Sequence, residues 1–244
     1  MHAGMMHGEA VAGTFWGHAL PGTLFLAWAA YWAGLAILRG TVAGAGRTLE
    51  PSALLPVMKI ALTVVGVWIE IPGQGWYPMD VMMNWQHVTM YSVFGISGVV
   101  DLMARAGRIS PQSTFVAYAA AMGNAGFLFW GHSSHGGVEG TIHTLLALVF
   151  FAVCAVALIE IVRPSGGMVW GRIGTQVLLG AWFIVGAWII YRSGWDLADP
   201  VRQGWTYTMF SWTAVGAALI TLASRFAAGA RASRIGLPWG PTAL

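Results

Sequence analysis

The chain has 244 residues, of which 57% are hydrophobic and 9% are charged, and its formal net charge at pH 7 is +3. Because soluble domains carry about 25% charged residues, this composition excludes an ordinary soluble enzyme and predicts a membrane protein surrounded by lipid. The basic residues are dispersed and form no single stripe, which argues against nucleic acid as a partner.

Seven charge-poor apolar stretches follow one another along the chain, and each is long enough to cross a bilayer as a helix of about 20 residues. The predicted spans are 18–38, 52–71, 81–104, 112–131, 139–162, 173–192 and 204–225. No basic segment precedes the first span and no small-residue cleavage site follows it, so we expect it to be retained. Since the connections are short, we expect one all-α domain over residues 1–244, a seven-helix transmembrane bundle.

Basic residues at the span ends predict the orientation. Nine arginines fall at one end of the spans: Arg39, Arg47, Arg105, Arg108, Arg163, Arg172, Arg225, Arg231 and Arg234. Arginines in short loops stay on the cytoplasmic side. The sequence therefore predicts an N-terminus outside and a C-terminus in the cytoplasm, in a bacterial cytoplasmic membrane that the chain crosses several times.

Five of the seven histidines fall at the opposite, outer end of the spans. They are His18, His87, His132, His135 and His143. A histidine inside a membrane usually faces the bundle interior and needs a partner, so several at one depth predict a shared transition-metal site. Glu70, at the end of the second span, and Asp196, in the last outer loop, are candidate oxygen ligands.

The third span adds a sulfur ligand to this candidate site. His87, Met90, Tyr91 and Phe94 recur at the spacing of one helix face, which predicts an imidazole, a thioether and a phenol directed inward. Copper would accept this mixture, whereas zinc would prefer the histidines with Glu70 or Asp196. The N-terminal segment from Met1 to His7 resembles a copper-binding tail.

Other polar residues have structural interpretations. The Pro21-Gly22 pair stands at the predicted start of the first span, where a missing N–H costs little and where it would place His18 near a helix N-terminus. Asp101 precedes Arg105 by four residues and Glu160 precedes Arg163 by three, spacings that predict local ion pairs. Lys59, inside the second span, is expected to extend to the interface or to pair with one of these acids.

Several of these residues lie in motifs that resemble the transmembrane protein 45 family, also catalogued as a domain of unknown function and found in animals and plants. The motifs are Gly17-His18-Ala19-Leu20-Pro21-Gly22-Thr23, Trp85-Gln86-His87-Val88-Thr89-Met90-Tyr91, His132 to Gly136, Ile142-His143-Thr144-Leu145-Leu146 and Gly180-Ala181-Trp182-Phe183. The resemblance, to a bacterial-type member, implies a seven-span fold without an agreed activity. His18, His87, His135 and His143 carry over, whereas Gln86 and Thr213 stand where the family has histidines.

The sequence leaves several functions open. The first is the binding of copper or zinc in metal handling or sensing. The second is a zinc hydrolase acting on a lipid amide or ester, with Glu70, Glu139 or Asp196 as the general base. The third is a metal-free scaffold or receptor, since single membrane histidines often only bridge helices. Haem with two axial histidines is a less favoured cofactor, and the oligomeric state is open.

Overall fold

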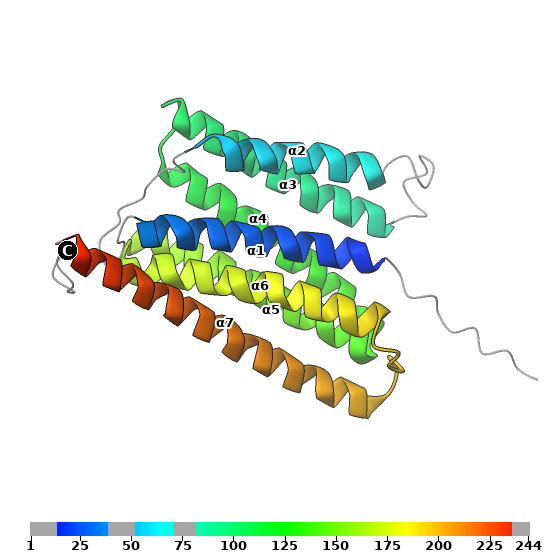
Figure 1. The fold of residues 1–244 in the computed structure, drawn as a ribbon. Helices are drawn as coiled ribbons and strands as arrows, with labels where there is room; N and C mark the ends of the chain where they lie inside the picture. The colour runs from blue at the N-terminus through cyan, green and yellow to red at the C-terminus, as the bar shows by residue number, and fades with distance from the viewer. Residues whose placement is uncertain (1–13, 39–51, 71–81, 236–244) are drawn as a thin grey trace, which may run out of the picture.

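A computed structural model of the chain describes residues 14–38, 52–70 and 82–235, and this part is all-helical. Its α-helices are α1 (Phe15–Leu38), α2 (Leu54–Glu70), α3 (Met82–Arg105), α4 (Gln112–His132), α5 (Gly137–Val162), α6 (Gly166–Tyr191) and α7 (Pro200–Arg234). A short 3₁₀ turn, η1 (Ser133–His135), links α4 to α5. Figure 1 shows the helices side by side along one common direction.

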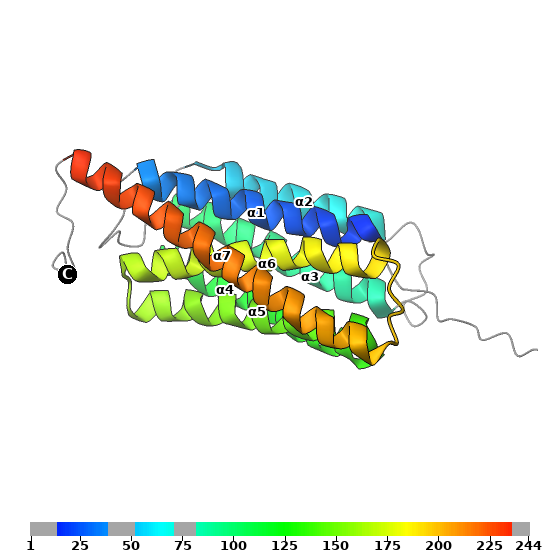
Figure 2. The ribbon, with the colours of Figure 1, turned by 60° about the horizontal axis from the view of Figure 1, so that its bottom comes forward.

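The helices pack as a bundle in which α1 lies along α6, α2 along α3 and α4 along α5. In Figure 2, α7 runs diagonally across the bundle and covers α5 and α6. The helices α1, α3, α5 and α7 begin at the same end of the bundle, where α2, α4 and α6 finish. We call this the histidine end, and we call the opposite end, where Arg105, Arg163 and Arg234 lie, the arginine end.

Five of the described helices are long and apolar enough to cross a membrane, and α2 is a shorter apolar helix. The five are α1, α3 from Trp85, α5, α6 and α7. Their lengths and composition fit a polytopic membrane protein, as the sequence predicts. Tryptophan side chains at the histidine end, Trp16, Trp85, Trp130 and Trp205, are exposed, as expected of an interfacial belt.

Two helices are longer than hydropathy predicts. Helix α6 begins at Gly166, well before the predicted start at residue 173, because the Ser165 side chain accepts a hydrogen bond from the Met168 N–H and caps it. Helix α7 begins at Pro200, where the Asp199 carboxylate accepts from the Val201 N–H, and it continues to Arg234. Polar capping residues and terminal arginines lie outside what a hydropathy pattern detects.

The first helix also begins earlier than predicted. Helix α1 starts at Phe15, so Pro21 lies inside it and not at its start. Proline has no N–H, so the carbonyl group of Gly17, four residues earlier, has no helical donor. The prediction that the Pro21-Gly22 pair opens the span was therefore wrong, because the helix gains a turn in which the Gly17 N–H donates to the Thr14 hydroxyl.

Candidate functional site

One pair of neighbouring histidine rings joins α1 to α5. His18 and His143 lie with their Nε2 atoms 3.3 Å apart and their rings stacked, with an angle of 24° between the ring planes. His143 is buried, and His18 is half-buried beside Tyr191 of α6. Two imidazoles that are 125 residues apart in the chain therefore direct the same ring nitrogen toward one point.

Two further histidines continue this cluster. The ring of His132, at the end of α4, lies 5.6 Å from that of His143 and 6.0 Å from that of His87 on α3. The His87 and His132 rings are nearly parallel, with 11° between their planes. Pairwise ring contacts thus link His18, His143, His132 and His87, whereas the predicted His135 side chain lies outside the described residues. We call the four linked residues the histidine cluster.

A backbone contact fixes the tautomer of one member of the cluster. The Nδ1 atom of His132 lies 2.9 Å from the carbonyl oxygen of Leu128, one turn earlier on α4. Since a carbonyl group can only accept, Nδ1 carries the proton and Nε2 of the neutral ring carries the lone pair. Histidine ligands of metals are commonly oriented by this kind of N–H···O=C contact.

The histidine cluster rests on a layer of aromatic rings, which we call the phenylalanine floor. It consists of Phe25, Phe94, Phe129, Phe150 and Phe183, which come from α1, α3, α4, α5 and α6. Neighbouring rings in the floor have centroids 5.4–6.1 Å apart. Phe129 also contacts the rings of His132 and His143, at 6.0 and 5.8 Å. The imidazoles therefore have an apolar surface directly beneath them.

A second polar layer lies closer to the arginine end. Lys59 of α2 and Asp101 of α3 form an ion pair of 2.6 Å, and both side chains are more than nine-tenths buried. Arg172 of α6 and Glu160 of α5 form a second pair of 2.9 Å, with Glu160 buried. We call these four residues the ionic layer. Each pair joins two neighbouring helices, and the charges of its two side chains cancel.

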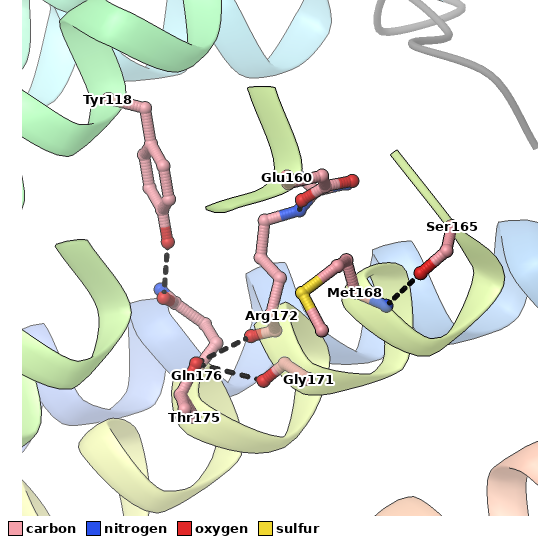
Figure 3. Close-up of polar contacts among 8 residues, drawn as sticks. All are labelled: Tyr118, Glu160, Ser165, Met168, Gly171, Arg172, Thr175 and Gln176. Carbon is pink, nitrogen blue, oxygen red and sulfur yellow. Dashed lines mark hydrogen bonds and ion pairs between the residues drawn. The ribbon is translucent and has the colours of Figure 1, made fainter. Parts of the chain in front are cut away.

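Aromatic rings lie between the two ion pairs. The Lys59 ammonium group is 4.6 Å from the Trp28 ring, and the Arg172 guanidinium group is 4.1 Å from the Trp32 ring. The Tyr118 hydroxyl, from α4, donates to the Gln176 side-chain oxygen at 2.7 Å in a fully buried contact, and Figure 3 shows this contact beside the Arg172–Glu160 pair. The cations are therefore shielded from lipid by cation–π contacts.

The ion pairs differ from those predicted by helix spacing. Asp101 pairs with Lys59 across two helices, where the sequence predicted Arg105, and Glu160 pairs with Arg172, where it predicted Arg163. The expectation that Lys59 pairs with one of the two acids is confirmed. Arg172 lies within α6 and not at a span end as predicted, because Glu160 neutralises it there. Spacing within one helix does not predict these pairs, because a buried carboxylate is stabilised by a cation that is buried beside it on a neighbouring helix.

The remaining predicted ligands have different positions. Met90 is partly buried against the core, on the same helix as His87. The ring of Tyr91 packs against Gly66 of α2. Asp196 is exposed in the α6–α7 connection, where it accepts from the Ala198 N–H.

Three predicted features lie outside what the structure describes. They are the side chain of Glu70, the side chain of His135 and the N-terminal segment from Met1 to His7. Among the described residues, no group of three or more histidine, cysteine or acidic side chains has the geometry of a metal site. The His18–His143 pair brings two ring nitrogens of the cluster to within 3.3 Å of each other.

Sequence reasoning missed the Tyr118–Gln176 contact and the phenylalanine floor. Both depend on residues from helices that are distant in the chain, and a single Phe or Gln in an apolar span carries no distinctive signal. The only sequence signal was the presence of Gln176 within a predicted span, since a polar side chain there needs a partner.

Comparison with known proteins identifies a similar family whose function is unknown. Residues 111–198, from α4 to the α6–α7 connection, match a family described as "Family of unknown function (DUF716)". This segment contains His132 and His143 together with Tyr118, Glu160, Arg172 and Gln176.

Two curated mammalian proteins are similar over a larger part of the chain. "Transmembrane epididymal protein 1A" of Mus musculus is 28% identical over 173 residues, which cover 66% of this chain and 55% of that protein. "Transmembrane epididymal protein 1" of Rattus norvegicus is 29% identical over 152 residues, covering 58% and 48%. The chain thus spans about half the length of these relatives, and no solved structure matches it. The similarity is therefore to proteins named as transmembrane proteins and, over residues 111–198, to a family of unknown function.

Proposed function

We propose that this protein binds one transition-metal ion, copper or zinc, through the histidine cluster and serves in metal handling or sensing. In this proposal all seven helices span the membrane, the histidine end faces outward, and the membrane is a bacterial cytoplasmic membrane. The protein is then a bacterial-type member of the transmembrane protein 45 family. The single observation that carries the proposal is the 3.3 Å separation of the His18 and His143 Nε2 atoms.

That separation suits a tetrahedral metal ion. With Zn–N bonds of about 2.0–2.1 Å, two ligands at a tetrahedral angle have nitrogens about 3.3 Å apart. The same distance also allows one Nε2 to donate a hydrogen bond to the other when the two rings are in different tautomers. The two Nε2 atoms already have the spacing of two metal ligands.

A third ligand would come from His132, because its Nδ1 proton bonds to the Leu128 carbonyl group and directs its Nε2 lone pair away from α4. Its ring centroid is 5.6 Å from that of His143. The three imidazoles do not surround one point in the described geometry, so a three-histidine site would need His132 to move together with its Leu128 contact. His87, stacked on His132, would supply the fourth ligand or orient the third.

Elemental analysis of detergent-purified protein without a histidine tag tests this proposal. We expect about one copper or zinc per chain, and its loss in His18→Ala and His143→Ala. Gln203→Ala, which removes another polar side chain at the histidine end, is the matched control and should keep the metal. A metal-free wild-type protein after growth with copper and zinc would contradict the proposal and favour a scaffold or receptor.

A zinc hydrolase is a second candidate, because Glu139 precedes His143 by four residues and so lies on the same face of α5, one turn nearer the histidine end. A carboxylate there could act as general base for a metal-bound water. In Glu139→Gln, hydrolysis of lipid esters or amides should disappear while the metal content stays unchanged. Absence of hydrolysis by the zinc-loaded wild-type protein would exclude this candidate.

A further inference from the structure

The histidine cluster and the ionic layer are separated by one stack of apolar side chains. On α1, His18, Phe25 and Trp32 follow at intervals of seven residues, so they lie on one helix face, and the Trp32 ring contacts Arg172 of the ionic layer. With a rise of about 1.5 Å per residue, each step along this face is about 10 Å. The floor therefore lies between the two polar layers, about 10 Å from His18 along α1.

The same order recurs on the neighbouring helices. On α5 the sequence runs from His143 through Phe150 to Glu160, and on α6 it runs back from Phe183 to Gln176. Phe150 is fully buried and Phe183 is 3% exposed. Because five helices each contribute one phenylalanine to the floor, its rings meet at the centre of the bundle and not at its rim.

The spaces above and below the floor are also filled by apolar side chains. Leu146 lies between His143 and Phe150 on α5, and Leu179 lies between Gln176 and Phe183 on α6. Both leucines are fully buried, as is Met122 on α4. A hydrated cation that moved from the histidines to the ionic layer would have to lose its water in this apolar layer, at a cost of many kcal/mol.

We propose that the phenylalanine floor closes the histidine cluster toward the arginine end, so that a bound ion enters and leaves only through the histidine end. This inference rests on the proposed metal binding. Apolar constrictions close membrane pathways because water does not fill them. The protein would then acquire or sense a metal on one side of the membrane, and it would not conduct that metal across.

Oriented vesicles test this proposal with zinc as the probe. Purified protein is reconstituted in one orientation, and labelled Zn²⁺ is added at either face. We expect loading from the histidine face alone for the wild-type protein and for Phe150→Leu, which keeps the floor apolar. Phe150→Ser places a hydroxyl group in the floor and should allow loading from both faces. Equal loading of the wild-type protein from both faces would overturn the proposal.

A labelling experiment tests the closure by the phenylalanine floor independently of metal binding. In a Cys154→Ala background, which removes the single native cysteine, His87→Cys places a thiol above the floor. A membrane-impermeant thiol reagent should modify it from the histidine face only, and from both faces when Phe150→Ser is added. Modification from the arginine face without that change would overturn the closed floor. Failure of zinc to bind to the wild-type protein in detergent, with one-sided labelling of the cysteine variant retained, would instead reject the metal.

Discussion

Gly22 of α1 and Gly180 of α6 contact each other reciprocally. A Cβ atom added to Gly22 would lie 2.8 Å from the Gly180 carbonyl oxygen, and one added to Gly180 would lie 2.7 Å from the Gly22 carbonyl oxygen. Only two glycines allow the backbones to come this close, as is common where membrane helices cross. The contact lies one helical turn after His18 on α1, toward the arginine end, and it sets the position of α1 in the bundle.

We therefore expect Gly22→Ala and Gly180→Ala to destabilise the protein by about 1–3 kcal/mol each, because the backbones must separate. Gly34→Ala is the matched control on α1, where an added Cβ meets nothing within 4 Å. Thermal unfolding in detergent measures both effects. Melting temperatures of Gly22→Ala and Gly34→Ala that fall equally would show that the close contact has no special role.

The Lys59–Asp101 pair leads to a second prediction. Asp101→Asn leaves a buried ammonium group without its anion and should cost about 3–5 kcal/mol. The double variant Lys59→Met/Asp101→Leu removes both charges and should recover most of this loss. Arg202→Gln, which breaks an exposed pair of 3.9 Å with Asp199, is the control and should cost at most about 1 kcal/mol. A double variant as unstable as Asp101→Asn would contradict this account.

His87 provides a third prediction. Its ring stacks on His132 at 6.0 Å, so His87→Ala removes either a ligand or the support of one. The metal content should fall below that of the wild-type protein. His87→Gln keeps most of the side-chain volume and should lose metal as well, whereas a purely packing role would leave the metal bound in this variant. Elemental analysis after gel filtration gives the readout.

Metal binding should also depend on pH. Only the neutral imidazole can donate a lone pair, so protons compete with the metal for the nitrogens of the histidine cluster. Affinity should be highest at neutral and mildly alkaline pH and should fall at acid pH, where protons displace the metal. Equilibrium dialysis against Zn²⁺ at several pH values measures this fall. An affinity that does not fall at any acid pH at which the protein stays folded would argue against histidine ligands.

The last prediction concerns orientation. A reporter fused after Leu244 should be active in the cytoplasm, and a tag before Met1 should be accessible from outside, because seven spans place the termini on opposite sides. A fusion after Ser110, in the connection between α3 and α4, provides an internal control and should also be cytoplasmic. A C-terminal reporter active only outside would reverse the sidedness of the histidine cluster.

The sequence predicted the helical class and most helix positions because hydropathy records burial in lipid directly. Helices α3 and α4 agree with their predicted ranges to within a residue. The position of the histidines at one end of the bundle was also predictable. Successive spans run in opposite directions, so the starts of the first, third and fifth spans, with His18, His87 and His143, lie at the same end.

The side-chain contacts between helices were not predictable from the sequence. Whether Glu160 meets Arg163 or Arg172 depends on which helix lies beside α5, and spacing within one helix cannot decide this. The contact of Tyr91 with Gly66 likewise depends on the rotation of α3 and on which helix lies beside it. A ring of one phenylalanine from each of five helices likewise exists only after the bundle has formed.

Pro21 has a consequence for how the cluster could accept a ligand. The first turn of α1, which carries His18, lacks the hydrogen bond that a Pro21 N–H would have given to the Gly17 carbonyl group. Below that point, α1 is held by its glycine contact with Gly180. The turn that carries His18 is therefore joined to the packed part of α1 with one backbone hydrogen bond fewer, and we expect its imidazole to adjust to a ligand more easily than the imidazoles of α4 and α5.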